Sequence, residues 1–347
     1  MISALARRGH RLHVAVPGEL ALRAPLPPEV VIHRLLPPGT EWSPRAMAAF
    51  MLRLRRLASR VPADVIHQLN PVVTGVSLGL PRGGPPLVLG PFVGEWPAPP
   101  GLRSAVKRAV KRQVLAAQER RADLLLLSTP AAASKLAHHG RVAAKSRVLG
   151  YGIDLERFRA TPPPNGDPRI LFLGRLDQEK GVFMLLDAFE RLRHPTARLR
   201  LAGGGQNADA VRRRAARLER VELVGPVPRE RVPDEMAACA IYCMPSFSEP
   251  FGLGALEAMA CGRSVVATRA GGLAHLVPPD GGRLVAPGDA EALAAALAEL
   301  LDDPGRRAAQ GAANRRRVEA EHGWDHVAAR LEDHYESLID RRRRSVG

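Results

Sequence analysis

The stretch Glu249-Pro-Phe-Gly-Leu-Gly-Ala-Leu-Glu257 carries two carboxylates eight positions apart, on either side of a Pro-Phe-Gly elbow. An apolar run, Ala240–Met244, precedes it and is typical of a buried strand. The residues from Leu253 onward have helical spacing up to Gly262, which is a common helix terminator. The first carboxylate is therefore expected at a strand exit, and the second in the first turns of the next helix.

Strand-to-helix turns of this kind are ligand sites in open α/β sheets, where ligands bind at the carboxyl ends of the strands. A helix N-terminus at that edge offers backbone N–H groups and a positive dipole end to an anion. Two carboxylates that can accept hydrogen bonds from hydroxyls, beside such an anion site, predict a sugar nucleotide as the ligand.

A second motif, Gly174-Arg-Leu-Asp-Gln-Glu-Lys-Gly181, lies between the predicted strand Arg169–Leu173 and the predicted helix Val182–Leu192. Its two cations are Arg175 and Lys180. The chain has only five lysines against 46 arginines, so a lysine retained here indicates a need for a compact ammonium group. Lysine suits a phosphate as a point charge, and arginine as a planar fork.

These cations would stabilise a departing nucleoside diphosphate as it gains negative charge. One cation about 4 Å away contributes about 4 kcal/mol at an effective dielectric near 20. Together with the backbone N–H groups of Phe251, Gly252 and Leu253, the two cations would take the place of a metal ion. We therefore expect no metal and no cofactor. The alternative is that Arg175 and Lys180 only cap or solvate a turn.

Strands alternate with helices in both halves, which predicts an α/β protein with two doubly wound, Rossmann-like domains facing a cleft. We expect a basic acceptor-binding domain over 1–160, a donor-binding domain over 161–323, and a C-terminal helix with a basic tail over 324–347. The Pro-rich stretch 161–168 is the predicted linker. Leu5–Gly9 has the pattern of a helix end, so the chain is expected to start inside a helix, with the first strand and glycine loop of its first domain missing.

The element boundaries follow from the same patterns. Strands are expected at 12–16, 30–35, 64–67, 87–90, 123–127, 147–149, 169–173, 197–202, 221–224, 240–244, 264–267 and 283–285. Helices are expected at 45–59, 102–121, 130–138, 182–192, 290–301 and 324–340, with a solvated tail at 341–344.

The formal net charge of +16 is concentrated in the first half. Residues 1–160 hold 24 Lys and Arg against 9 Asp and Glu, while the remainder holds 27 against 26. This asymmetry predicts an anionic partner such as a membrane surface, although an Arg-rich composition without a partner explains it equally well. The helices Arg45–Ser59 and Leu102–Arg121 are basic and amphipathic, with Val106, Val110 and Val114 as the apolar face of the second; they contact either solvent or anionic lipid. With only 4% aromatic residues, nucleic-acid binding is not expected.

Several motifs together resemble the retaining GT-B glycosyltransferases of family 4, also described as glycosyl transferases group 1. The resemblance is densest from 169 to 290 and rests on the following segments: 174–181, Gly225-Pro-Val-Pro, Pro245-Ser246, 249–262 and Gly271-Gly272. It implies that Arg175 and Lys180 hold the donor diphosphate and that Glu249 binds hydroxyls of the transferred sugar. It also implies that Glu257 binds the ribose hydroxyls and that Phe251, Gly252 and Leu253 present N–H groups to donor oxygens.

The sequence departs from the family pattern at three places. The glycine-rich loop after the first strand is absent. No histidine follows the predicted strand Leu87–Gly90, where Gly90-Pro-Phe-Val-Gly-Glu-Trp96 stands instead, so no catalytic histidine is nominated. His275 stands where the family often has Glu. The alternative is therefore a non-catalytic, glycosyltransferase-like binding protein. The triplet Gly203–Gly205 is interpreted as a tight turn at a sheet edge.

The remaining features predict a cytoplasmic enzyme, peripheral to the inner face of the plasma membrane if its acceptor is lipid-linked or an envelope glycan. No run of 18 apolar residues is present and the first ten residues do not form a signal peptide. The three cysteines lack Cys-x-x-Cys spacing and fit small buried residues in a reducing compartment.

Overall fold

The computed structural model describes residues 1–18, 25–41, 43–69, 75–92, 102–136, 139–162 and 166–346. The chain divides into two compact units. Unit 1 contains the described residues up to Gly152 together with those from Trp324 onward, and unit 2 runs from Ile153 to Gly323. The boundary therefore lies eight residues before the expected one at 160. The terminal helix belongs to unit 1 and is not the separate segment that the sequence suggested.

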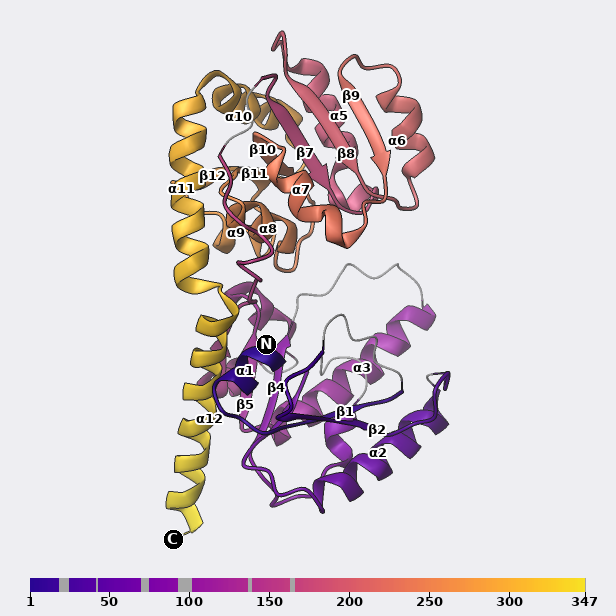
Figure 1. Ribbon diagram of the computed structural model, residues 1–347. Coiled ribbons are helices and arrows are strands. Elements are labelled where there is room, and N and C mark those ends of the chain that lie inside the picture. Colours follow the sequence, from indigo (N-terminus) through magenta and orange to yellow (C-terminus); the bar gives the residue numbers. More distant parts are fainter. Residues whose placement is uncertain are drawn as a thin grey trace. The chain divides into compact units, whose positions relative to one another are not determined.

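Unit 2 holds one six-stranded parallel sheet (Figure 1). Its strands are β7 (Arg169–Leu173), β8 (Arg198–Ala202), β9 (Val221–Gly225), β10 (Ile241–Met244), β11 (Ser264–Thr268) and β12 (Gly282–Val285). Its helices are α5 (Val182–Arg191), α6 (Ala208–Ala215), α7 (Val232–Ala237), α8 (Leu253–Ala260), α9 (Leu273–Leu276), α10 (Ala290–Asp302) and α11 (Pro304–Glu321). The strand order β12-β11-β10-β7-β8-β9 is that of a doubly wound dinucleotide-type sheet, as expected.

The strands β10 and β11 in the sheet of unit 2 are buried because they are largely apolar on both faces. All four residues of β10 and all five of β11 are buried. Helix α5 covers one face with Val182, Leu185 and Leu186, each at 0% exposure. Near-continuous apolar strands are typical of parallel sheets covered by helices on both sides.

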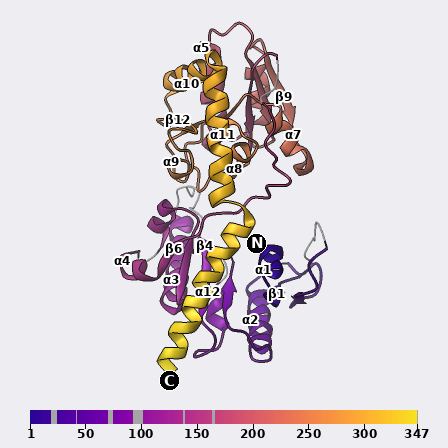
Figure 2. The ribbon, with the colours of Figure 1, turned by 60° about the vertical axis from the view of Figure 1, so that its left-hand side comes forward.

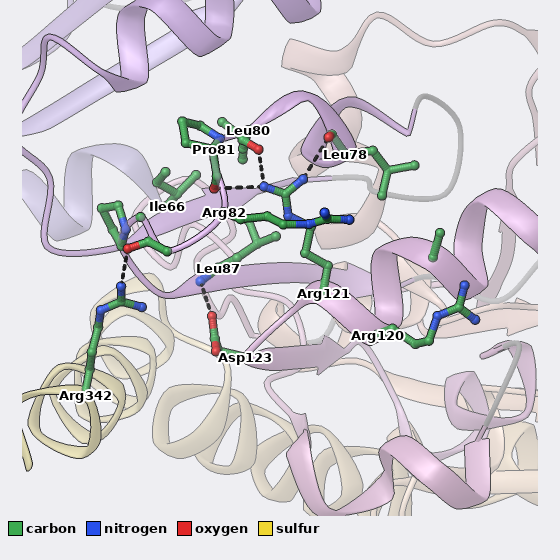
Figure 3. Close-up of a pocket in the computed structure, with 14 residues that line it drawn as sticks. Ile66, Leu78, Leu80, Pro81, Arg82, Leu87, Arg120, Arg121, Asp123 and Arg342 are labelled. Atoms are coloured by element: carbon green, nitrogen blue, oxygen red, sulfur yellow. Dashed lines mark hydrogen bonds between the residues drawn. The ribbon is translucent and has the colours of Figure 1, made fainter. Parts of the chain in front are cut away.

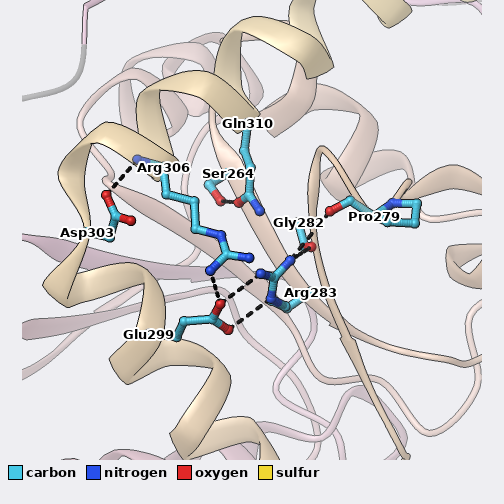
Figure 4. A network of polar contacts seen from close by, with 8 residues as sticks. All are labelled: Ser264, Pro279, Gly282, Arg283, Glu299, Asp303, Arg306 and Gln310. Carbon is cyan, nitrogen blue, oxygen red and sulfur yellow. Dashed lines mark hydrogen bonds and ion pairs between the residues drawn. The ribbon is translucent and has the colours of Figure 1, made fainter.

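A polar network joins α10, α11 and β12 at the surface of this unit (Figure 4). Arg283 of β12 donates to both carboxylate oxygens of Glu299 on α10, at 2.7 and 2.9 Å. Arg306 of α11 binds the same carboxylate, while Asp303 caps α11 by accepting from the Arg306 backbone N–H at 2.8 Å. Because these side chains are partly exposed, the network orients the helices more than it stabilises the fold.

Unit 1 contains only parallel strand pairs among its described residues. Its strands are β1 (Leu12–Val16), β2 (Val30–Arg34), β3 (Ile66–Gln68), β4 (Leu87–Phe92), β5 (Leu124–Leu127) and β6 (Ser146–Val148). Its helices are α1 (Ile2–Arg7), α2 (Pro44–Ala58), α3 (Leu102–Arg121), α4 (His139–Val142) and α12 (Trp324–Val346).

These strands form two sheets, β1-β2 and β3-β4-β5-β6, and not the single sheet expected. Strands β1 and β3 are therefore not paired with each other, and they belong to different sheets. Each sheet keeps its own apolar cover: Phe50 of α2 is buried beside Leu35 and Leu36 near β2, and Leu125 of β5 is fully buried.

Helix α12 packs against the four-stranded sheet and against α1 (Figure 2). Val327 and Leu331 are buried with Val88 of β4 and Leu124 of β5. This shared core explains why the last helix belongs to unit 1. The helix also continues through Arg341–Arg344 to Val346, so these residues are helical and not a tail, although three of the four arginines are exposed, as expected.

Two other sequence expectations for unit 1 need correction. Residues 130–135 form a 3₁₀ helix, not an α-helix reaching 138. In α3, Val110 is 59% exposed, whereas Leu115 and Ala116 are buried. The buried residues of α3 therefore lie in its C-terminal half, which packs over β4 and β5, and Val110 of the expected valine stripe is not among them.

A buried imidazole ties α12 to the sheet. His67 of β3 lies with Nδ1 2.6 Å from the Tyr335 hydroxyl and Nε2 2.8 Å from the Gly90 carbonyl oxygen. Because a carbonyl only accepts, Nε2 carries the proton and Nδ1 accepts from Tyr335. Burial lowers the pKa of His67 to about 4, although the Gly90 hydrogen bond opposes this. The fold therefore holds His67 neutral.

We expect this histidine to make unit 1 less stable in mild acid. Its pKa in the fold lies below the unfolded value, so its contribution is present above about pH 6.5 and is lost as the pH falls toward 4. Between pH 7.5 and 5.0, urea unfolding of the parent should lose about 2 kcal/mol more than His67→Gln loses. The exposed His326 on α12 provides the control, since His326→Gln should keep the parent's pH dependence. Equal pH dependence in parent and His67→Gln would contradict the assignment.

Candidate functional site

Two loops leave adjacent strands at the middle of the sheet in unit 2. Strands β7 and β10 pair with each other, and the strand order reverses between them. Ligands of doubly wound sheets bind at the carboxyl ends of the strands at this reversal point. Both predicted loops, 174–181 after β7 and 245–252 after β10, leave at this edge.

The first loop lies directly against the glycine triplet that follows β8. The Leu176 N–H donates to the Gly204 carbonyl at 2.8 Å, and a Cβ atom on Gly203 would lie 1.8 Å from the Gly174 carbonyl oxygen. Gly203 also has φ +145°, which favours glycine. Because β8 lies between β7 and β9, this triplet is not the sheet-edge turn that the sequence suggested. It supports the loop that carries both cations.

Arg175 is held by a neighbouring acid. Its Nη1 lies 2.6 Å from Oδ2 of Asp177, and its side chain is 56% exposed. The other oxygen of Asp177 accepts from the Gln206 backbone N–H at 3.1 Å. Asp177 therefore orients the guanidinium and joins the loops after β7 and β8.

Lys180 and Glu249 form a buried ion pair across the two loops. Lys180 Nζ lies 2.6 Å from Oε2 of Glu249, and the two side chains are only 12% and 8% exposed. Their positions differ by 69 in the sequence, and the adjacency of β7 and β10 brings them together. A buried pair of this kind is sensitive to the loss of either partner.

The backbones of the two loops are also in contact. The Phe247 N–H donates to the Glu179 carbonyl at 2.8 Å. Gly181, with φ +71°, lies so close to the second loop that a Cβ atom would be 1.9 Å from the Pro245 carbonyl oxygen. This close approach fixes the distance over which Lys180 reaches Glu249.

Gly252 begins α8 with a positive φ of +102°, and a Cβ atom there would lie 2.7 Å from Leu273. The N–H groups in the first turn of any α-helix lack partners inside the helix, so those of α8 are suited to an anion. Leu253 is half exposed, while Phe251 is 4% exposed and contacts the His322 ring edge-on at 6.2 Å. The elbow is therefore a rigid support with one exposed apolar side chain.

Glu257 faces into the protein from α8. Burial raises the pKa of Glu257, and the charges of Arg229 and Arg157 oppose that shift. The nearby Tyr242 of β10 donates its hydroxyl to the Leu173 carbonyl at 3.1 Å. Burial, followed by the negative charges of Glu257 and then Glu249, places the pKa of Tyr242 well above its ordinary value. The negative charges of both carboxylates therefore raise the pKa of the same phenol, which belongs to the second residue of β10.

Comparison with known proteins identifies the family. The family described as "Glycosyltransferase Family 4" matches residues 1–157, and the family described as "Glycosyl transferases group 1" matches residues 154–317. The D-inositol 3-phosphate glycosyltransferase of Xylanimonas cellulosilytica is 33% identical over 310 residues, which cover 82% of this chain and 69% of that protein. The chain belongs to the group 1 glycosyltransferases. These are enzymes that transfer sugars.

Other relatives in this family differ in substrate. A Mycobacterium tuberculosis glycogen synthase is 33% identical over 235 residues, covering 64% of this chain and 57% of that protein. A GDP-mannose-dependent monoacylated alpha-(1-6)-phosphatidylinositol monomannoside mannosyltransferase of Corynebacterium glutamicum is 34% identical over 205 residues, covering 53% and 54%. The chain spans between about half and about two thirds of the length of these three relatives.

Solved structures show that the fold is GT-B. Sucrose-phosphate synthase from Thermosynechococcus elongatus has a TM-score of 0.78 at 24% identity, covering 98% of this chain and 92% of that one. The Anabaena protein HepE in complex with UDP has a TM-score of 0.72 at 22% identity, covering 89% and 86%. At this level of identity the likeness concerns the fold alone.

The structure of this glycosyltransferase brings together most of the nominated residues. Lys180 and Glu249 are in contact, and the charges of Glu257 and Glu249 both raise the pKa of Tyr242. Arg175 lies on the same loop as Lys180, but its guanidinium binds Asp177. Neither Asp177 nor Tyr242 is among the residues predicted from the sequence. Asp177 could have been found from its position two residues after Arg175, whereas the role of Tyr242 depends on the strand order.

Several other expectations concern residues away from these loops. The end of the stretch Gly90–Trp96, where no histidine is present, lies outside the described residues. His67, which ends one of the expected strands, is a buried structural residue. His275 is exposed at the end of α9.

The described residues contain neither a metal-binding cluster nor a membrane-spanning helix. No group of three His, Cys, Asp or Glu residues in the described ranges is placed to hold a metal ion. In that same part of the chain, no helix combines the length and apolar character required to cross a bilayer. All three cysteines are free and buried, as the sequence suggested.

Proposed function

We propose that this chain is a metal-independent, retaining glycosyltransferase that uses a nucleotide-diphosphate sugar and a hydroxyl acceptor that is lipid-linked or part of an envelope glycan. The buried Lys180–Glu249 pair between the loops after β7 and β10 carries the proposal. The names of the relatives support the substrate class, since they include an inositol phosphate and a phosphatidylinositol mannoside as acceptors.

In the free protein, each nominated cation is neutralised by a carboxylate. Arg175 binds Asp177, and Lys180 binds Glu249. A donor diphosphate would replace these partners, because phosphate oxygens accept charge-assisted hydrogen bonds from both kinds of cation. Glu249 would then be released to accept hydrogen bonds from hydroxyls of the transferred sugar.

During transfer, the bond between the sugar carbon and the diphosphate oxygen breaks as the acceptor oxygen bonds the same carbon from the same face. The acceptor proton passes to the departing phosphate oxygen. Arg175, Lys180 and the N–H groups at the start of α8 would stabilise the charge that develops on this leaving group. The two cations would thereby do what a bound metal ion does in other transferases.

The direct test is product formation with defined donors. The full chain is incubated with UDP-glucose or GDP-mannose and with inositol 3-phosphate or a phosphatidylinositol mannoside. Release of UDP or GDP with a product that keeps the donor's anomeric configuration by NMR is expected. Donor binding without release would indicate a non-catalytic binding protein, and an inverted product would contradict the retaining mechanism.

Glu257→Gln is expected to raise the donor KM by about 10-fold with kcat changed by less than about threefold. A ribose contact lies away from the reacting carbon and strengthens ground state and transition state alike. Because burial raises the pKa of Glu257, the parent should lose donor affinity on acidification at a higher pH than an ordinary carboxyl would give, and Glu257→Gln should not show this loss. The exposed Glu219 provides the control, as Glu219→Gln should match the parent. A large fall in kcat for Glu257→Gln would contradict this role.

A further inference from the structure

A cavity of about 540 Å³ lies in unit 1, on the opposite edge of a sheet from the strand ends at which α/β proteins usually bind ligands (Figure 3). Its walls include Ile66 and Leu87, the first residues of β3 and β4. The loop 80–85, the last turn of α3 and Arg342 of α12 complete it. None of the nominated donor-site residues lines this cavity.

The charged side chains around the cavity are mostly cationic. Arg82, Arg120, Arg121 and Arg342 line it together with one acid, Asp123. The carboxylate of Asp123 is engaged elsewhere: Oδ2 accepts from the Leu87 backbone N–H at 2.7 Å. The same acid also acts electrostatically on Lys145. The cavity therefore has an excess of positive charge.

Arg121 is fixed by neutral partners. Its guanidinium donates to the carbonyls of Leu78 at 2.7 Å and Pro81 at 2.9 Å, and also to that of Leu80. Burial lowers the pKa of Arg121, and the charge of Arg82 lowers it further. Two guanidinium groups therefore lie close enough to repel each other, as Figure 3 also shows.

Arg82 and Arg120 are exposed at the cavity, and no carboxylate of the described residues lies within ion-pair distance of either. Arg342 donates to the Gly83 carbonyl and so holds the loop 80–85 against α12. The loop is thus fixed on two sides by arginines that bind carbonyls. Arg82 and Arg120 are therefore the side chains best placed to bind an anion in the cavity.

We propose that this cavity binds a phosphate ester. Guanidinium groups match phosphate oxygens in bidentate geometry, and a cluster of them favours phosphate over a singly charged carboxylate. A volume of about 540 Å³ lies within the usual range for small-molecule sites. Ile66, Leu78 and Leu80 add apolar surface, so the ligand carries an uncharged part beside its phosphate. Either a phospholipid headgroup or a soluble phosphate ester supplies this chemistry.

The test compares two double variants with the same change in charge. Arg82→Glu/Arg120→Glu changes the cavity, and Arg213→Glu/Arg217→Glu changes two exposed arginines of unit 2. All proteins, including the reference, carry Lys180→Ala and Glu249→Gln, so that the donor site contributes little and no unpaired carboxylate is left buried there. Calorimetric titration with glycerol 3-phosphate should show binding to the reference protein, at least a 10-fold weaker affinity for the cavity variant, and less than a twofold change for the control.

A second arm distinguishes the two sources of phosphate. Sedimentation with phosphatidylglycerol vesicles, against phosphatidylcholine vesicles, is measured for the same proteins. If the cavity variant, but not the control, binds phosphatidylglycerol vesicles less than the reference protein does, the ligand is a lipid headgroup. If the cavity variant binds the vesicles normally and loses affinity only for glycerol 3-phosphate, the ligand is a soluble ester. Equal losses in both double variants would show an effect of net charge and overturn the site, as would the absence of any binding by the reference protein. Should the Glu variant unfold, Arg82→Gln/Arg120→Gln is expected to weaken binding at least threefold.

Discussion

Replacing Lys180 with alanine is expected to lower kcat for sugar transfer by about 100- to 1000-fold, with a smaller change in the donor KM. The ammonium group acts on charge that grows as the diphosphate departs, so its loss affects the transition state more than the bound donor. Initial rates of nucleoside diphosphate release, measured over a range of donor concentrations, separate the two effects.

The same substitution leaves Glu249 buried without its partner, which costs about 3–5 kcal/mol of stability. The double variant Lys180→Ala/Glu249→Gln removes that unpaired charge. It should regain most of the lost thermal stability and remain inactive, which separates a folding defect from a catalytic one. Lys180→Arg keeps the charge but places a planar fork in a slot that holds an ammonium, so an intermediate rate is expected. A Lys180→Ala enzyme within threefold of the parent would contradict the proposed mechanism.

Gly181→Ala is expected to lower activity by about 100-fold, because a displacement of about 1 Å is enough to misplace catalytic groups by that factor. The added Cβ atom would lie 1.9 Å from the Pro245 carbonyl oxygen, so the loops after β7 and β10 must separate. Lys180 would then move away from Glu249. We also expect a loss of about 2–5 kcal/mol in stability, from left-handed backbone strain together with the steric conflict.

Gly225 supplies a matched control for this prediction. Its φ of +72° is almost the same as the +71° of Gly181, but a Cβ atom on Gly225 would have no heavy atom within 4 Å. Gly225→Ala therefore carries the backbone strain of about 1–2 kcal/mol without the steric conflict. Chemical denaturation measures the stability of both variants, and initial rates measure their activity; Gly181→Ala is expected to lose more of each than Gly225→Ala. Equal losses in the two variants would show that the contact between the loops does not matter.

Local patterns predicted the strands of unit 2 closely, but no bounds were predicted for its helices α6, α7, α9 and α11. Strand β7 was predicted at its observed bounds, Arg169–Leu173, because an apolar run there ends at a glycine. The two strand-exit loops were correctly located for the same reason, since each begins where an apolar run stops. Helix α3 also has the expected bounds, Leu102–Arg121.

Contacts between distant segments could not be predicted in the same way. The Lys180–Glu249 pair depends on β7 lying beside β10, which is a property of strand order and not of spacing. The face that α3 buries was misjudged because periodicity shows that a helix is amphipathic but not which turns have a neighbour. The sequence of α12 likewise does not show which unit the helix packs against, because its contacts, such as Val88 and Leu124, lie far from it in the sequence.

Because the chain returns to unit 1 at its end, the two units differ in which segments each needs in order to fold. Unit 2 is continuous from Ile153 to Gly323, and its two ends are joined by a backbone hydrogen bond of 2.7 Å from the Ile153 N–H to the His322 carbonyl. Its core can therefore be completed without any residue of α12. Unit 1, although its first 152 residues emerge earlier, must wait for Val327 and Leu331 before its core is filled. Before α12 packs, unit 1 therefore exposes the apolar surface that Val327 and Leu331 cover, and such surface is prone to aggregation.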